Sequence, residues 1–95
     1  MGITSRERVE ELVKQATLAF YDESTKAELA SSIQVDYLTQ ENNGHKVMVF
    51  AESHEYENER PVWAEIDDVI IDLEPEKVGL SSYHVHVEIT ESEDE

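Results

Sequence analysis

The sequence predicts a small α+β domain, in which an N-terminal helix and a possible short second helix pack on one face of a four-stranded antiparallel sheet. Apolar residues recur with a period of 3.6 in the N-terminal segment and with a period of two from Ile33 onward. A turn-forming segment, ENNGH, separates two of the alternating stretches, as in a β-hairpin. The length of 95 residues suits one core. We therefore expect a single domain over residues 1–90 and an acidic, disordered tail over residues 91–95.

The first helix is predicted from one apolar stripe, with charged residues on its other sides. The residues of this stripe are Val9, Leu12, Val13, Ala16, Ala19 and Phe20. Thr4 and Glu7 form a capping-box pattern, so the helix should begin near Ser5 and end near Tyr21. A second pattern of this kind, Thr25 with Glu28, predicts about two turns of helix over the segment that follows.

The strands follow from alternation. IQVDYLTQ and KVMVFAES form the predicted hairpin around ENNGH. In residues 62–73 the apolar residues alternate, but they change phase at Asp67-Asp68. A β-bulge there would keep one strand with one apolar face, whereas a turn would make two strands; we favour the bulge. Pro75 and Gly79 predict a connection to the last strand, YHVHVEIT.

The last strand carries the pattern that most resembles a metal site. His84, His86 and Glu88 fall on one face, because strand side chains alternate. Two imidazoles and a carboxylate at this spacing could bind zinc. The apolar residues between them must face the core, which leaves the histidines on the solvated face. We therefore predict no metal site and no cofactor.

The charge of the chain restricts its partners. There are 23 acids and 7 bases, a net charge of −16, and residues 51–95 alone carry −13. Such a field repels nucleic acid and anionic lipid, and it attracts basic protein surfaces. The absence of cysteine, of an apolar signal segment and of a membrane-spanning run leads us to expect a cytoplasmic protein that contacts neither membrane nor nucleic acid directly.

No sequence motif for catalysis stands out. The chain has no G-x-S-x-G nucleophile pattern, no phosphate-binding glycine loop and no EF-hand spacing. The serine pairs precede predicted elements, where caps and turns explain them. We therefore expect that the protein is not an enzyme.

The segment HEYENERPVWAEIDD is the predicted binding edge. In an extended chain, Glu55, Glu57 and Glu59 lie on one side at intervals of ~6.8 Å, twice the ~3.4 Å rise per phosphate of one DNA strand. Glu65, Asp67 and Asp68 would extend this acidic edge, while Tyr56 and Trp63 would act as apolar anchors. The alternative is a solvated edge whose charges prevent aggregation.

The run IQVDYLTQENNGHKVMVF followed by PVWAEIDD resembles the central hairpin and next strand of the phage uracil-DNA glycosylase inhibitors, small acidic α+β proteins that mimic DNA. The resemblance covers about residues 22–72 and includes Glu23-Ser24, where that family has a Glu-Ser pair. It implies that Glu23 contacts the DNA-binding loop of a target and that Met48 fills an apolar pocket. Thr25 departs from the family, which has an apolar residue at that place.

Together these features predict an acidic protein-binding module, an inhibitor or DNA mimic that presents carboxylates to a basic surface of a nucleic-acid enzyme. The expected contact residues are Glu23, Met48, Glu55, Tyr56, Glu57, Glu59, Trp63, Glu65, Asp67 and Asp68. We expect a monomer or a homodimer. The alternative is a structural or self-associating domain whose acidity serves solubility or salt adaptation.

Overall fold

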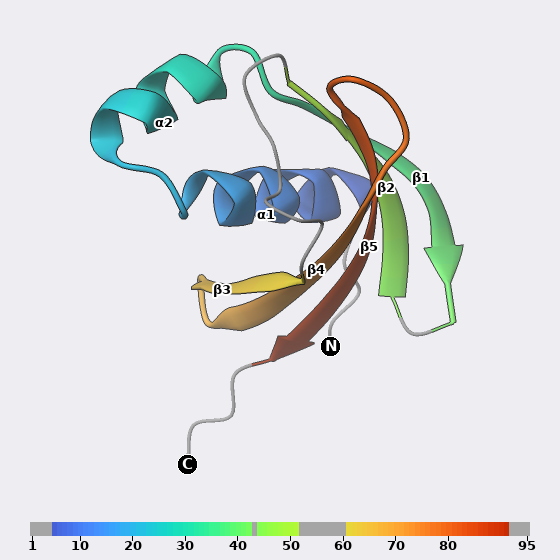
Figure 1. Ribbon diagram of the computed structural model, residues 1–95. Helices are drawn as coiled ribbons and strands as arrows, with labels where there is room; N and C mark the ends of the chain where they lie inside the picture. The colour runs from blue at the N-terminus through green and yellow to red at the C-terminus, as the bar shows by residue number, and fades with distance from the viewer. Residues whose placement is uncertain (1–4, 43, 52–60, 92–95) are drawn as a thin grey trace.

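A computed structural model describes residues 5–42, 44–51 and 61–91 of the protein. In this part of the chain, two helices precede a sheet of five strands (Figure 1). The elements are α1 (Arg6–Leu18), α2 (Glu23–Ala30), β1 (Gln34–Glu41), β2 (Gly44–Phe50), β3 (Val62–Ile66), β4 (Val69–Lys77) and β5 (Ser82–Glu91). The α+β class and the antiparallel sheet are confirmed, and the sheet has one strand more than predicted.

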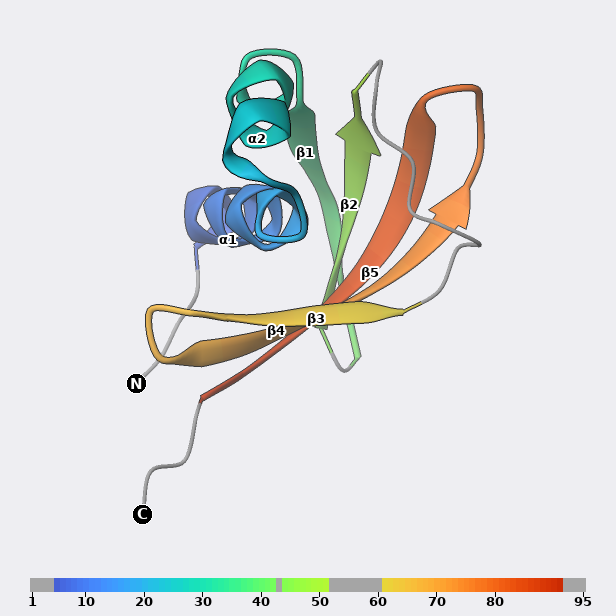
Figure 2. The ribbon, with the colours of Figure 1, turned by 60° about the vertical axis from the view of Figure 1, so that its left-hand side comes forward.

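The strand order is β1-β2-β5-β4-β3, and every pair of neighbours is antiparallel. The last strand of the chain, β5, therefore lies at the centre of the sheet. The sheet curves around α1, and both helices lie on the same side of it (Figures 1 and 2). We call the face that packs against α1 the inner face and the opposite one the outer face. Neither helix is long and apolar enough to cross a lipid bilayer, within the residues described.

The core lies between α1 and the inner face. Val9, Leu12, Val13 and Ala16 of the helix are at most 1% exposed. They meet the inward-facing residues of the central strands, and Val85 and Val87 of β5 are completely buried. The predicted alternation of β5 is thereby confirmed, because its valines lie in the core and its histidines on the outer face.

The end of α1 differs from the prediction. The helix ends at Leu18, and the chain then turns toward α2, so Phe20 leaves the apolar stripe and is 51% exposed. Ala19 is also exposed. Leu18 and Tyr21 pack against the core instead.

The helix caps also differ from the predicted pairs. Ser5 caps α1, because its Oγ accepts a hydrogen bond from the Arg8 amide at 3.1 Å. Asp22 caps α2 by accepting from the Thr25 amide at 2.9 Å. This bond, and a second one from the Thr25 side chain, lower the pKa of Asp22 below its ordinary value. In addition to these hydrogen bonds, the helix dipole favours a negative charge at a helix N-terminus.

The predicted bulge at Asp67-Asp68 is wrong, because a turn there separates β3 from β4. Both residues have positive φ, 51° and 67°. Two consecutive residues in this conformation form the type I′ turn, which suits the twist of a two-residue hairpin. The turn also explains the change of phase, since Ile66 lies opposite Val69 and both sets of apolar residues reach one face.

The predicted break at Pro75 is also wrong, because β4 continues through it to Lys77. Pro75 lies opposite Val85 and is buried. The Val78 amide donates to the Ser82 carbonyl at 3.0 Å, so the backbone N–H and C=O groups of even-numbered residues at this end of β4 point toward β5. The Pro75 nitrogen points to the opposite side of β4, the side of β3. The pairing of β3 begins only with Val62 opposite Leu73, so Pro75 lies beyond it. The missing amide hydrogen therefore costs no bond to β5.

Candidate functional site

The described helices leave the outer face of the sheet uncovered (Figure 2). Strand register places its side chains in rows that cross several strands. These rows are Asp36–Met48–His84–Glu76, Thr39–Lys46–His86–Glu74 and Glu88–Asp72–Trp63. The site is thus built from segments far apart in the sequence.

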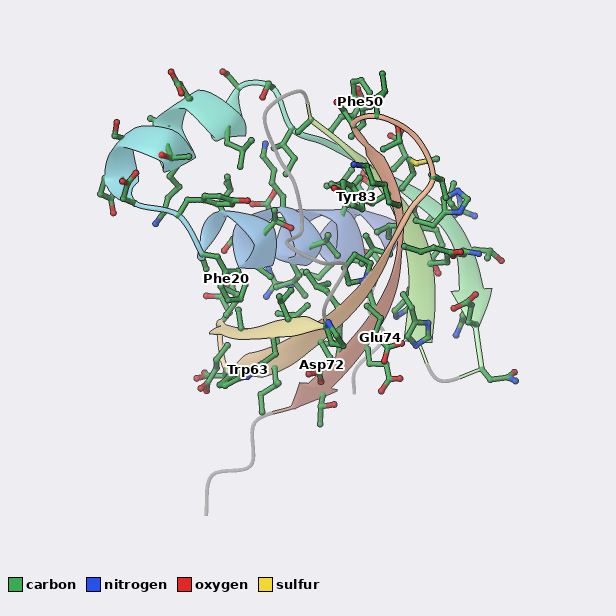
Figure 3. All side chains as sticks on the ribbon, viewed as in Figure 1. Phe20, Phe50, Trp63, Asp72, Glu74 and Tyr83 are labelled. Atoms are coloured by element: carbon green, nitrogen blue, oxygen red, sulfur yellow. The ribbon has the colours of Figure 1, made fainter. Side chains whose placement is uncertain are left out.

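Carboxylates dominate this face. The acids placed there are Asp36, Glu41, Glu65, Asp72, Glu74, Glu76 and Glu88. Among the described residues of the face, Lys46 alone carries a permanent positive charge. Asp72 and Glu74 are exposed and lie on the side of the sheet away from α1 (Figure 3). The outer face is therefore strongly negative around a central histidine.

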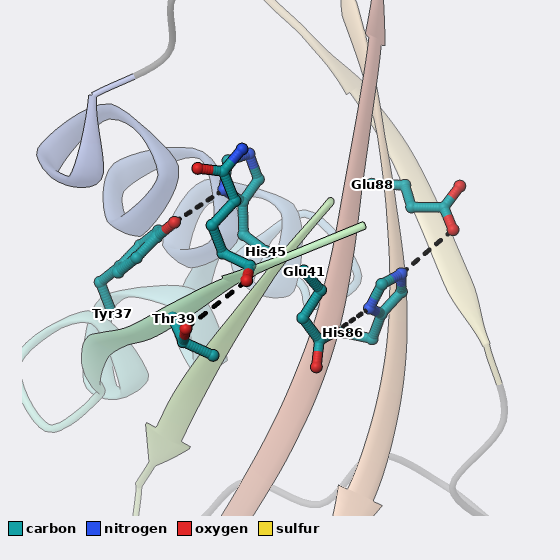
Figure 4. Close-up of polar contacts among 7 residues, drawn as sticks. Tyr37, Thr39, Glu41, His45, His86 and Glu88 are labelled. Atoms are coloured by element: carbon teal, nitrogen blue, oxygen red, sulfur yellow. Dashed lines mark hydrogen bonds and ion pairs between the residues drawn. The ribbon is translucent and has the colours of Figure 1, made fainter. Parts of the chain in front are cut away.

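His86 is held between two carboxylates (Figure 4). Its Nδ1 lies 2.6 Å from Glu41 Oε1, and its Nε2 lies 3.1 Å from Glu88 Oε2. Both ring nitrogens donate only when the imidazole is protonated. The geometry therefore favours the imidazolium, which joins the end of the edge strand β1 to the central strand β5.

The pKa values of His86 and His45 are shifted in opposite directions. Partial burial alone would lower the pKa of His86, but hydrogen bonds and attraction from Glu41 and Glu88 outweigh it and raise that pKa. Burial, and then repulsion from His86, lower the pKa of His45. His45 lies on the inner face, where its Nδ1 is 3.0 Å from the Tyr37 hydroxyl.

A pocket of about 170 Å³ opens beside His86. Its lining residues are Pro61, Asp72, Leu73, Glu74, His86 and Glu88. Three of these are carboxylates, and Trp63 lies next to Asp72 in the adjacent strand. The pocket thus combines negative charge with an aromatic neighbour.

Apolar side chains flank the acids. Trp63 is 61% exposed and Phe50 is 44% exposed. Phe50 lies beside Ser82 at one end of the face, and Trp63 lies near the other end, on the edge strand β3. Large exposed aromatic residues of this kind frequently carry the binding energy of protein interfaces.

The predicted contact residues do not all lie together. Met48, Trp63 and Glu65 are on the outer face. Glu23 is the first residue of α2, in the helix layer, and it pairs with Lys26 at 3.6 Å. Asp67 and Asp68 occupy the β3–β4 turn, and Asp67 lies 3.3 Å from the Arg8 guanidinium. The remaining predicted residues, Glu55, Tyr56, Glu57 and Glu59, lie outside the described residues.

Within the histidine pattern of β5, hydrogen bonds engage His86 and Glu88. Both nitrogens of His86 are engaged by carboxylates, as described above. No group of three or more potential metal ligands occurs among the residues with a described structure.

The acidic column of β4, which consists of Asp72, Glu74 and Glu76, is not predicted by the sequence analysis above. Their alternation with Leu73 and Pro75 is visible in DLEPE, but a proline by itself predicts the end of a strand. Phe50 was also missed, although it continues the alternation of Lys46 and Met48. A proline can lie within a strand where its nitrogen faces an unpaired side, and a strand that continues through Pro75 predicts this column.

Comparison with known proteins gives no further assignment. No protein-family model matches the sequence, and neither curated proteins nor solved structures give a match.

Proposed function

We propose that the protein is a binding module that presents the outer face of its sheet to a basic surface of a partner protein. The observation that carries this proposal is the concentration of carboxylates on one uncovered face. Among the described residues of that face, Lys46 is the one permanent positive charge. Complementary charge accelerates association and excludes partners of the wrong sign. The exposed Trp63 and Phe50 add anchors that charge alone does not supply.

The basic surface is, in this proposal, one that binds nucleic acid. Asp72, Glu74 and Glu76 follow one another on β4 at intervals of ~6.8 Å, about twice the rise per phosphate of a DNA strand. Carboxylates at such intervals can occupy positions that phosphates would take. The resemblance to the uracil-DNA glycosylase inhibitors favours the same class of partner, an enzyme that acts on nucleic acid, and the protein would inhibit it by competition.

Self-association is the alternative function, favoured by the aromatic residues that the outer face exposes. Two copies that met through this face would bring like charges together, which is unfavourable. A stable oligomer in dilute buffer would support the alternative, and a monomer under the same conditions would support binding of a basic partner.

The experiment is capture of partners by the immobilised protein at low salt, followed by elution at rising salt. One variant, Asp72→Asn/Glu74→Gln/Glu76→Gln, removes three charges from the outer face and keeps its shape. The matched control, Glu7→Gln/Glu11→Gln/Glu28→Gln, removes three exposed charges from the helices. Each captured protein is then tested for competition by duplex DNA.

We expect a partner that is retained by the wild type and by the helix control, lost by the sheet variant and displaced by DNA. Its affinity should fall steeply with salt, because exposed charges are screened within ~10 Å at 0.1 M. Equal capture by the sheet variant would refute the outer face as the site. Retention that DNA cannot displace would refute the nucleic-acid-binding class of partner.

A further inference from the structure

The acidic column of β4 has a repeat that matches an extended chain. Asp72, Glu74 and Glu76 are all exposed, while Leu73 and Pro75 between them are buried. Their spacing of ~6.8 Å equals the interval between side chains on one side of any extended segment. In a helix, residues four positions apart are separated by ~6 Å along the axis, so a helix loses this register over successive contacts.

One end of the column suits a guanidinium group. The pocket of about 170 Å³ beside His86 is lined by Asp72, Glu74 and Glu88, with Pro61 as an apolar wall. Arginine presents donors in a planar fork that matches carboxylates. Trp63, opposite Asp72 and 61% exposed, offers a face on which a guanidinium can stack.

The other end of the face is apolar. Phe50 of β2 lies opposite Ser82, and the Val78 amide donates to the Ser82 carbonyl. Phe50 and Val78 therefore lie on either side of Ser82. Val78 is 46% exposed and Leu80, in the adjoining β4–β5 loop, is 93% exposed. Among the described residues, Phe50, Val78 and Leu80 at this end can receive an apolar side chain, and none of the three carries a charge that would attract a cation. We call Phe50, Val78 and Leu80 the apolar end.

We infer that the outer face binds an extended basic segment of a partner protein, laid along β4 with alternate Arg or Lys side chains on Asp72, Glu74 and Glu76. An arginine occupies the pocket beside Trp63, and an apolar residue of the segment rests on the apolar end. The inference rests on the proposed function, and it adds the conformation, composition and direction of the segment that is recognised. The charge of the face and the different chemistry of its two ends determine that direction.

The test uses synthetic peptides, with binding followed by calorimetry and by amide chemical shifts. The first peptide alternates arginine with threonine and has one leucine at the end expected at Leu80. A second peptide has the same composition with its arginines adjacent, and a third has the leucine at the opposite end. Two protein variants are compared, the Asp72→Asn/Glu74→Gln/Glu76→Gln variant and Phe50→Ser/Leu80→Ser. The helix variant described above serves as the control.

We expect the first peptide to bind about tenfold more tightly than the second, a difference of about one unit in the logarithm of Kd. It should shift amides of β4 and β5, and lose about tenfold in affinity with the acidic-column variant but not with the helix control. Its advantage over the third peptide should vanish in Phe50→Ser/Leu80→Ser. Equal affinity for the first two peptides would overturn the extended register, and an advantage over the third peptide that survives the serine variant would overturn the direction.

The outcomes also separate this inference from the proposed function. If the peptides bind equally but the lysate experiment still yields a partner that depends on the outer face, only the extended segment is refuted. If no partner depends on that face and no basic peptide shifts its amides, both proposals fail.

Discussion

At the scale of single residues, the proton on His86 is linked to the folded state. Its raised pKa means that folding favours the protonated ring, since only the folded chain places Glu41 and Glu88 beside it. The resulting stabilisation is fully present below the unfolded value of ~6.5 and disappears as pH rises through the higher folded value. The proton also reduces the negative charge in the middle of the outer face.

The first prediction follows from the raised pKa of His86. His86→Gln should destabilise the protein most at pH values below ~6.5, and the difference from wild type should shrink as pH rises above the folded pKa. The measurement is chemical denaturation at a series of pH values. His84→Gln, two residues away on the same face, is the matched control. A difference between His86→Gln and wild type that does not depend on pH would contradict the bridging role.

The second prediction separates two apolar residues that the sequence treats alike. Leu12 is 1% exposed under the sheet, whereas Phe20 is 51% exposed beyond the end of α1. Leu12→Ala should destabilise by about 2–5 kcal/mol, because it leaves a cavity in the core. Phe20→Ala should cost less than about 1 kcal/mol, as substitutions on the surface usually do. Thermal or urea denaturation measures both, and equal losses would place Phe20 in the core after all.

At the scale of elements, the turn between β3 and β4 depends on backbone conformation. Asp68 has φ of 67°, a region that β-branched residues rarely enter. Aspartate tolerates it better than most residues, and glycine enters it freely.

The third prediction concerns this turn. Asp68→Val should destabilise by on the order of 1–2 kcal/mol, the usual cost of a left-handed residue. Asp68→Gly should retain or increase stability, because the position then has no Cβ to strain. Denaturation midpoints of the two variants provide the comparison. If valine were tolerated as well as glycine, the segment would not be a type I′ turn.

The elements differ in how far the sequence determines them. The stripe of α1 and the alternation of β5 predict their buried faces, because both follow from local periodicity. The phase change at Asp67-Asp68 is visible in the sequence, but choosing a turn over a bulge depends on which strand pairs with which. Pro75 reads as a break because local rules do not show which edge of β4 is unpaired.

The candidate site was less accessible from sequence than the fold. The alternation of β5 places His86 and Glu88 on the outer face, as predicted. The partner that completes the arrangement, Glu41, is 45 residues from His86 and reaches it only through the register of three strands. Periodicity identifies which face a residue occupies, whereas its neighbours on that face depend on tertiary pairing.

At the scale of the whole molecule, repulsion among like charges opposes folding. The chain carries 23 acids and 7 bases. The ion pairs Arg8–Asp67 and Glu23–Lys26 are largely exposed. Such pairs contribute roughly 0–1 kcal/mol each, too little to offset the excess of negative charge.

The fourth prediction is that salt stabilises the protein. Raising sodium chloride from 0.01 M to 1 M shortens the screening length from ~30 Å to ~3 Å, which weakens repulsion in the compact state. The Tm should therefore rise with salt in scanning calorimetry. Repeating the series with potassium chloride tests that screening, rather than one particular cation, is responsible. A Tm that stays constant or falls would show that repulsion is not a significant cost.

The central position of β5 bears on how the chain is made. Residues 82–91 are synthesised after every other described element, yet β2 and β4 both pair with them. Until they leave the ribosome, the β1–β2 and β3–β4 hairpins have no strand to join them, and each keeps an unpaired edge and an apolar face. Unpaired edges in nascent chains favour aggregation. The carboxylates along β4 would then protect the growing chain, because their mutual repulsion keeps two nascent copies apart.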